Sequence, residues 1–199
     1  NRLHAQVEPH FLYNSLASAQ LLTRSDPAKA DEMLGNLITY LRHSLPRTED
    51  SLSTIGEELE RTRAYLDIMK IRMGSRLNVQ YEIPDYLKPV LFPSMMLQTL
   101  VENAIKHGLE PQRGPGRLTV RAWQADGQLH LQVRDTGQGL VTGQEPGVGL
   151  ANLVERMRLL HPGSSFQLQA GPGRGALACL RIPVPESDNV HPGHGPFAP

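Results

Sequence analysis

Three short glycine-bearing segments in the second half of the chain constrain its fold more than any other feature. They read VENAIKHG over residues 101–108, DTGQG over 135–139 and GVGLAN over 147–152. The first ends an apolar helical stripe, the second follows an alternating strand, and the third opens a helix. Each is weak alone, but together they offer a metal-binding amide, a carboxylate for an adenine amine and two glycine turns for phosphates. This order predicts a nucleoside triphosphate site.

The first segment offers a metal ligand. Asn103 shares a helix with an apolar face formed by Leu97, Leu100, Val101, Ala104 and Ile105. An amide oxygen suits Mg²⁺, which binds between protein and phosphates and keeps several waters. Lys106 and His107 follow and are expected to reach the phosphates of ATP. Taken alone, the segment is explained better by an ordinary amphipathic helix with a polar edge.

The second segment offers a contact for the base. Asp135 directly follows the alternating strand pattern of residues 129–133. A carboxylate walled by apolar side chains can accept a hydrogen bond from the adenine amine, where guanine has a carbonyl, so the contact would select adenine. Gly137 and Gly139 allow the backbone to come close to the base. The alternative is a D-x-G-x-G turn, which is common.

The third segment offers a phosphate site. Gly147 and Gly149 open a helix that continues from Leu150. A glycine-rich helix start presents free amides and the positive end of the helix dipole to phosphates. The short polar stretch over residues 140–146 is expected to form a mobile lid over the nucleotide. A plain helix start is an equally good explanation of the glycines, and no Walker-type motif occurs.

The N-terminal region is predicted to be a helical hairpin. Residues 1–46 carry two apolar helical stripes separated by a turn before Pro27. Such a hairpin has little of its own to pack against, so dimerisation into a four-helix bundle is the natural solution. We expect the hairpin domain to cover residues 1–50, an ATP-binding domain to cover 51–184, and a disordered Pro-, Gly- and His-rich tail to cover 185–199.

The remaining pattern mixes helices and strands. A polar linker is expected over 46–53, followed by a helix with a capping box formed by Thr54 and Glu57. Further helices are expected over 93–107 and 148–160, and strands over 77–83, 118–123, 129–133, 166–170 and 176–184, with a hairpin turn at Asp126-Gly127. Without strict β-α alternation, this order predicts an α+β two-layer sandwich.

Composition excludes some classes of protein. Lys+Arg and Asp+Glu are equal at 20 each, so no basic field points to direct nucleic-acid binding. Cys179 is the only cysteine, which excludes an internal disulfide and favours a reducing compartment. No apolar run is long enough to span a membrane. Because the chain begins at Asn1 rather than Met, we expect an upstream region to be missing.

A candidate nucleophile lies near the N-terminus, in the segment PHFLYN over residues 9–14. Imidazole, the side chain of His10, is a competent nucleophile near neutral pH. Pro9 falls inside the helical pattern and is expected to bend the helix. Asn14 lies one turn after His10 on the same face and is expected to orient its ring. For a histidine considered alone, a polar surface position is the better interpretation.

The three glycine segments resemble, in order, the N, G1 and G2 boxes of the GHKL (Bergerat) ATP-binding fold. Histidine kinases, gyrase-type topoisomerases, Hsp90-type chaperones and MutL-type repair proteins share this fold. Residues 173–176 resemble its closing glycine segment, with Ala176 where threonine is usual. The resemblance covers about residues 54–184. It implies that Asn103 holds Mg²⁺ and that Asp135 binds adenine.

One position distinguishes the chemistries within this fold. Hydrolytic members carry a glutamate four residues before the N-box asparagine, where this chain has Thr99. Glu102 is adjacent to Asn103 and therefore projects about 100° away around the helix. The usual water-activating base is missing, which favours phosphoryl transfer to a protein side chain over hydrolysis.

The N-terminal segment supplies the acceptor. PHFLYN resembles the phosphoacceptor box of LytS/YehU-type sensor histidine kinases, and residues 41–45 (LRHSL) and 57–59 (EEL) resemble further segments of that subfamily. The resemblance implies a homodimer that autophosphorylates His10 from Mg-ATP, a cytoplasmic location below a membrane sensor, and a response regulator, often of LytTR type. A GHKL ATPase and an inactive nucleotide-binding scaffold are the alternatives. Glu8, Asn14 or no protein group could assist the loss of the His10 proton, and transfer within or between subunits stays open.

Overall fold

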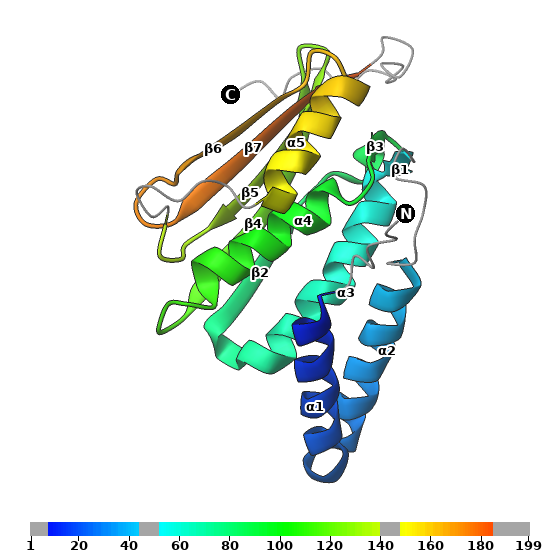
Figure 1. The fold of residues 1–199 in the computed structure, drawn as a ribbon, viewed down its shortest axis with the longest axis vertical. Coiled ribbons are helices and arrows are strands. Elements are labelled where there is room, and N and C mark those ends of the chain that lie inside the picture. Colours follow the sequence, from blue (N-terminus) through cyan, green and yellow to red (C-terminus); the bar gives the residue numbers. More distant parts are fainter. Residues whose placement is uncertain (1–7, 44–51, 140–147, 185–199) are drawn as a thin grey trace, which may run out of the picture.

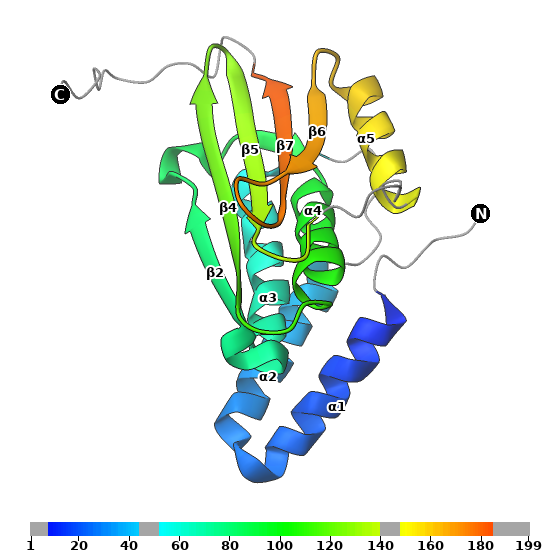
Figure 2. The same ribbon diagram turned by 90° about the vertical axis from the view of Figure 1, so that its left-hand side faces the viewer.

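The structure is a computed structural model that describes residues 8–43, 52–139 and 148–184 of the 199-residue chain. A helical hairpin precedes a sheet that carries helices on one face, which confirms the predicted α+β class (Figures 1 and 2). The helices are α1 (Pro9–Ser25), α2 (Pro27–His43), α3 (Ile55–Met73), α4 (Met96–Ala104) and α5 (Val148–Leu160). The strands are β1 (Leu52–Thr54), β2 (Leu77–Glu82), β3 (Leu91–Pro93), β4 (Gly116–Ala125), β5 (Gln128–Asp135), β6 (Ser165–Ala170) and β7 (Ala176–Pro183).

The helical hairpin begins at Pro9, so the predicted bend at this residue is wrong. Glu8 is extended, with φ −68° and ψ 118°, and Pro9 is the first residue of α1. A proline fits this position because its missing amide has no partner in the first helical turn. As expected, Pro27 begins α2, where the amide of Lys29 donates to Asp26 Oδ1 at 3.2 Å.

The predicted N-cap of α3 is confirmed. The amide of Glu57 donates to the hydroxyl of Thr54 at 3.1 Å, which satisfies one of the free amides at the helix start. The Glu57 carboxylate accepts a further hydrogen bond from Ser53 Oγ at 3.1 Å. These contacts fix where the chain enters the longest helix of the described region.

The prediction missed two short strands beside α3, namely β1 and β3. The linker is expected to run to residue 53, but Leu52 and Ser53 already belong to β1. The helix expected from Pro93 begins at Met96, because Pro93 pairs with Leu52 as the last residue of β3. Strands of three residues are too short to show the alternation by which strands are recognised in a sequence.

The helix that carries the first glycine segment does not run regularly to its end. After Ala104 the chain forms a π turn over Ile105–Leu109, in which the amide of Glu110 donates to the carbonyl of Ile105 at 2.8 Å. The helix expected over 93–107 is therefore α-helical only as far as Ala104. Such single π turns within helices occur often at functional sites, and this one holds two of the predicted phosphate contacts.

The main sheet has the strand order β2-β4-β5-β7-β6. β2 and β4 are parallel and the other neighbours are antiparallel. The predicted turn between β4 and β5 is confirmed: Asp126 and Gly127 have φ of 53° and 70°, as the twist-matched two-residue hairpin requires.

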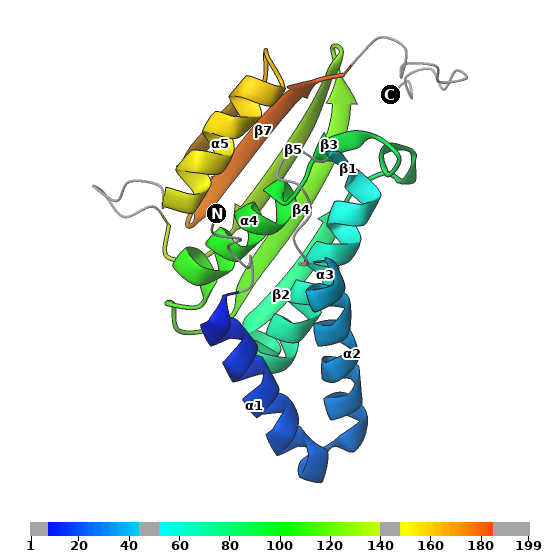
Figure 3. The same cartoon turned by 45° about the vertical axis from the view of Figure 1, so that its right-hand side comes forward.

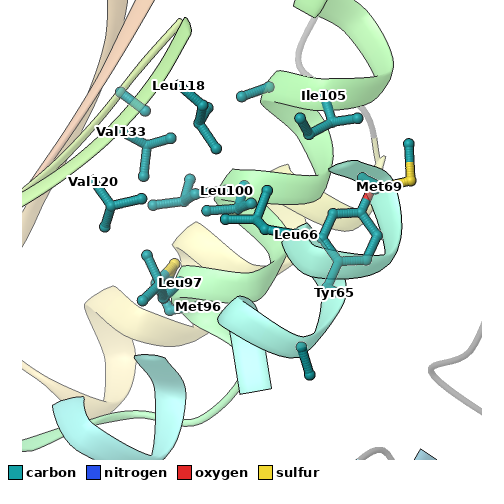
Figure 4. Packing of buried hydrophobic residues seen from close by; sticks show 14 of the residues in the cluster. Tyr65, Leu66, Met69, Met96, Leu97, Leu100, Ile105, Leu118, Val120 and Val133 are labelled. Atoms are coloured by element: carbon teal, nitrogen blue, oxygen red, sulfur yellow. The ribbon is translucent and has the colours of Figure 1, made fainter. Parts of the chain in front are cut away.

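The core lies between the sheet and helices α3 and α4. Figure 4 shows Leu118, Val120 and Val133 of the sheet facing apolar side chains of both helices. The alternation of inward apolar and outward polar residues along β4 and β5 follows from the two-residue period of a strand. In Figure 3 the hairpin runs beside α3, with the start of α1 near the end of α4. This arrangement places the N-terminal histidine segment next to the first glycine segment.

Parts of the prediction fall on residues that the structure does not describe. The tail over residues 185–199 and the lid over 140–146 are among them, and the division of domains at residue 50 stays a prediction. Within the described ranges, no helix is both long and apolar enough to cross a membrane.

Candidate active site

Asp135 lies at the end of β5, at the bottom of a small apolar pocket. Its side chain is only 3% exposed, and burial raises the pKa of the carboxyl, while hydrogen bonds from the amides of Gly137 and Ala176 oppose this rise. The amide of Gly137 lies 2.9 Å from Oδ1. The cavity holds about 40 Å³ and is walled mainly by aliphatic and aromatic side chains, namely Leu100, Val133, Leu150, Phe166, Leu168, Ala176 and Ala178. An apolar pocket with one buried acceptor suits a base that carries an amine.

Glycines let three chain segments meet around this carboxylate. A Cβ on Gly137 would overlap the carbonyl of Gly108, and a Cβ on Gly108 would lie 2.6 Å from Asp135 Oδ1. Gly175 has φ 106°, and a Cβ added to it would overlap the carbonyl oxygen of Asp135. Gly137 thus packs against Gly108, and its predicted approach to the base stays a prediction. Sequence reasoning missed Gly108, although its signal was the last letter of VENAIKHG.

The backbone also links the first two glycine segments directly. The amide of Gln138 donates to the carbonyl of Gly108 at 3.0 Å, and its side-chain amide donates to the carbonyl of His107 at 2.9 Å. Gly139 has φ 83°, a conformation that glycine adopts without strain. It lines the pocket of Asp135, which we call the base pocket after its expected ligand. Its approach to the base stays a prediction.

Asn103 stands between the base pocket and a second, larger cavity. The side chain is half-buried, and within the described ranges it makes no hydrogen bond, so its amide can take a ligand. The second cavity has a volume of about 450 Å³ and is lined by Asn103, Lys106 and His107. Asn103 and His107 line the base pocket as well. The structure therefore brings together three of the residues predicted from the first segment.

The predicted nucleophile lines the same large cavity. His10, on α1, shares it with Asn103, Lys106 and Thr99 of the sheet-bearing part of the chain. Residues about 90 positions apart in the sequence thus border one space. The structure thus places His10 and Asn103 at one cavity, and their roles as phosphoryl acceptor and metal ligand stay predictions.

Asn14 contacts the histidine ring, as its spacing predicted. Its Nδ2 lies 3.1 Å from His10 Nδ1. Because an amide nitrogen only donates, Nδ1 accepts in this arrangement and the neutral ring carries its proton on Nε2. With the amide turned over, Oδ1 would accept from Nδ1–H and Nε2 would hold the free lone pair. The ring therefore keeps a free lone pair, on Nε2, only when Asn14 Oδ1 accepts from Nδ1–H.

The third glycine segment is described only in part. Gly147 lies outside the described residues, and Gly149 is the second residue of α5. Leu150 is 4% exposed and borders both cavities. It forms an apolar wall shared by the two cavities.

Three further residues near the site were not predicted from the sequence. Phe11 contacts the rings of Tyr40 and Tyr65. Tyr40 Oη donates to Glu102 Oε1 at 3.2 Å, and burial raises the pKa of the Tyr40 hydroxyl, so it stays protonated. Burial also raises the pKa of Glu102. Helical spacing marked Phe11 only as part of an apolar stripe, and nothing in a sequence links Tyr40 to a partner 62 residues away.

Two protein-family models match the chain. The model described as "Histidine kinase" matches residues 1–77. The model described as "Histidine kinase-, DNA gyrase B-, and HSP90-like ATPase" matches residues 90–186. The chain belongs to the histidine kinases.

Curated relatives of this histidine kinase are sensor kinases. BtsS of Escherichia coli (strain K12) is 38% identical over 184 residues, covering 91% of this chain and 32% of that protein. LytS of Staphylococcus haemolyticus is 37% identical over 147 residues, covering 74% and 25%. YpdA of E. coli is 33% identical over 169 residues, covering 80% and 30%. These relatives confirm the predicted LytS-type resemblance, and the chain spans about a third or less of their length.

Solved structures of kinases share the fold. The histidine kinase domain of the blue-light activated kinase from Erythrobacter litoralis EL346 matches with a TM-score of 0.52 and 16% identity, covering 92% of this chain and 89% of that one. AdeS of Acinetobacter baumannii matches with a TM-score of 0.52 and 16% identity, covering 89% and 99%. At this identity the likeness concerns the fold alone.

Proposed function

We propose that this histidine kinase chain transfers the γ-phosphoryl group of Mg-ATP to His10 and then to an aspartate of a response regulator. The observation that carries the proposal is the cavity of about 450 Å³ that His10 and Asn103 line together. It adjoins the pocket of Asp135 along Asn103, His107 and Leu150. A base pocket, a phosphate space and an acceptor side chain thus follow one another without a break.

The residues of the site have distinct roles in binding ATP. Asp135 accepts a hydrogen bond from the adenine amine, and the apolar walls of the pocket cover the faces of the ring. Lys106 and His107 lie beyond Asn103, where the phosphates leave the base pocket. We assign Gly147 and Gly149 to the phosphates as well, by virtue of the helix start that they form.

Mg²⁺ fits the chemistry of Asn103. The amide oxygen is a hard ligand, and its lack of a hydrogen-bond partner among the described residues leaves it available. Within those residues no group of three or more His, Cys, Asp or Glu side chains forms a metal cluster. A single protein oxygen is compatible with an ion that takes its other ligands from phosphates and water. When bound, the ion would neutralise phosphate charge during transfer.

The transfer itself needs one lone pair on the imidazole. A neutral nitrogen of His10 attacks the γ-phosphorus, a P–N bond forms, and the bond to the β,γ-bridging oxygen breaks with its electrons going to ADP. The second nitrogen carries the ring proton, which passes to solvent. With Asn14 Oδ1 accepting from Nδ1–H, Nε2 keeps the free lone pair that the attack needs. Thr99 lines this cavity where hydrolytic relatives of the fold carry a glutamate, and a hydroxyl does not serve as the base for water.

We propose a homodimer as the working unit. Leu34, Ile38 and Leu41 leave an exposed apolar row on α2, and Leu16 and Leu21 are exposed on α1. Pairing two hairpins into a four-helix bundle would cover these side chains. ATP and response regulators are cytoplasmic, so we place the chain in the cytoplasm, attached to a membrane sensor region, with a regulator of LytTR type as partner.

Autophosphorylation with ATP labelled on the γ-phosphate tests the proposal. Wild-type protein should acquire acid-labile, alkali-stable label, which His10→Gln should abolish and His130→Gln, on the outer face of the sheet, should retain. Asn103→Ala or chelation of Mg²⁺ should also abolish labelling. Release of free phosphate without labelled protein would instead identify an ATPase, and nucleotide binding with neither outcome would identify a scaffold.

A further inference from the structure

The phosphoacceptor helix α1 is seated on the ATP-binding part of its own chain. Phe11, next to His10, is only 6% exposed. Its ring centroid lies 5.1 Å from that of Tyr40 on α2, in an edge arrangement, and 5.1 Å from that of Tyr65 on α3. Aromatic contacts favour defined ring orientations. Phe11 therefore fixes how α1 is rotated about its axis, and with it the direction of His10.

A partly buried hydrogen bond ties the hairpin to α4. Tyr40 Oη donates to Glu102 Oε1 at 3.2 Å, and Gln98 Nε2 donates to the same oxygen at 3.0 Å. Tyr40 is 1% exposed and its bond to the carboxylate is partly buried, so losing one partner is costly. Glu102 directly precedes Asn103. The bond thus sets the hairpin relative to the residue that holds the metal.

An ion pair at this cavity contributes less to holding α1 against the ATP-binding part of the chain. Lys106 Nζ lies 3.5 Å from Glu8 Oε1, and both side chains are more than half exposed. Solvent and salt screen such a pair, which is worth little to stability. The position of α1 therefore depends on the aromatic contacts of Phe11 and on the hydrogen bond between Tyr40 and Glu102.

The seated helix faces the nucleotide site of the same subunit. His10, Thr99, Asn103 and Lys106 all line one cavity, and Asn103 continues into the base pocket of Asp135. An ATP with its base in that pocket can direct its phosphates past Asn103 towards His10 without leaving the subunit. Transfer to a partner's histidine would require α1 to leave the contacts of Phe11.

We propose, on the basis of the kinase activity proposed above, that His10 takes its phosphoryl group from ATP bound to its own subunit, with Phe11 and Tyr40 as positioning residues. The His10 lone pair forms the P–N bond while the bond from the γ-phosphorus to ADP breaks. Phe11 holds the rotation of α1, and Tyr40 holds α1 and α2 at their distance from Asn103. Neither residue touches the reacting atoms.

Two mixed dimers with different affinity tags test the route of transfer. A dimer of wild-type and His10→Gln/Asn103→Ala subunits labels only if transfer stays within a subunit, and we expect about half the label of the wild-type homodimer. A dimer of His10→Gln and Asn103→Ala subunits labels only if transfer crosses the interface, and we expect none. Label confined to the second dimer, or equal rates in both, overturns the proposal. An unlabelled wild-type homodimer would instead disprove the kinase activity itself.

A second measurement tests the positioning residues. Tyr40→Phe keeps the ring and removes only the donor to Glu102, so we expect the labelling rate at saturating ATP to fall about tenfold. The Kd for ATP should stay unchanged, because Tyr40 does not line the base pocket. Tyr86→Phe, in an exposed turn, is the matched control. A wild-type rate in Tyr40→Phe, or a loss confined to ATP affinity, overturns this assignment.

Discussion

At the scale of single residues, the candidate site centres on a carboxylate that is buried from water. Asp135 is buried against apolar walls, with backbone amides of Gly137 and Ala176 as its partners. Burial of a charge without full compensation disfavours the ionised form. The same burial makes a hydrogen bond to an adenine amine stronger than it would be in water. The proposed recognition of adenine is therefore coupled to the pKa of this group.

We predict that nucleotide binding weakens on acidification through Asp135. The folded pKa of this carboxyl is raised above its ordinary 3.8, so the group accepts its proton at a higher pH than a free aspartate. Protonation removes the negative acceptor, and ADP affinity should fall as the pH drops through this raised pKa. Calorimetric titration of ADP at several pH values measures the effect. Asp135→Asn should bind more weakly and lack this pH step; an identical pH profile in both proteins would contradict the assignment.

A second residue-scale prediction concerns Gly137. A Cβ there would overlap the carbonyl of Gly108, and relieving an overlap with backbone typically costs about 1–3 kcal/mol. Gly137→Ala should lower the free energy of unfolding by this amount and weaken ADP binding, as measured by urea unfolding and calorimetry. Gly35→Ala is the control, since nothing lies within 4 Å of its Cβ on an exposed helix and it should stabilise by about 0.5–1 kcal/mol. Equal stability of the two variants would contradict the packing argument.

At the scale of elements, the hairpin has two apolar faces with different partners. Ala30, Met33, Leu37 and Tyr40 of α2 are buried within the chain. Leu34, Ile38 and Leu41 form the neighbouring exposed row. A helix that packs on one side needs only one apolar stripe, so the second row indicates a second contact. A dimer interface accounts for it.

We predict that Ile38→Glu lowers the dimer fraction. Ile38 is 58% exposed in the single chain, so the substitution should spare the fold but place a charge within the bundle, where burial is unfavourable. Thr39→Glu adds the same charge about 100° around the helix and should leave the dimer intact. Light scattering after size-exclusion chromatography over a dilution series measures both. A dimer equally stable in both variants would show that this row is not the interface.

The outcome of the sequence prediction differs between elements for physical reasons. The helix over 148–160 and the turn at Asp126-Gly127 follow from local signals, namely periodicity and turn chemistry, and both are confirmed. β1 and β3 are too short for any period to appear. The spacing of His10 and Asn14 predicted their contact, because one helical turn is local. The contact of Tyr40 with Glu102 depends on how two parts of the chain pack, and no local pattern encodes it.

At the scale of the whole molecule, the base pocket and the hairpin are separable in structure, and the proposed phosphoryl transfer joins them. The pocket of Asp135 is lined by residues of α4, its π turn, α5 and the strands β5, β6 and β7, with no residue of the hairpin. The cavity of about 450 Å³, by contrast, combines residues of α1 with those of α3 and α4. ATP binding should therefore survive without the hairpin, whereas phosphoryl transfer should not.

We predict that a protein of residues 52–184 folds, binds ADP with a Kd close to that of the full chain, and melts at a lower temperature. The base pocket is complete in this piece, but Tyr65 loses its contacts with Phe11 and Tyr40, and burying such aromatic surface contributes about 1.5–3 kcal/mol per side chain. In this piece the Tyr65 ring is left exposed, so Tyr65→Gln should raise its solubility without changing its ADP affinity. In the full chain the same substitution should lower the free energy of unfolding. Calorimetry and thermal unfolding measure these effects. If the piece fails to bind ADP while remaining folded, the hairpin is part of the nucleotide site, and the predicted division of the chain at residue 50 would be wrong.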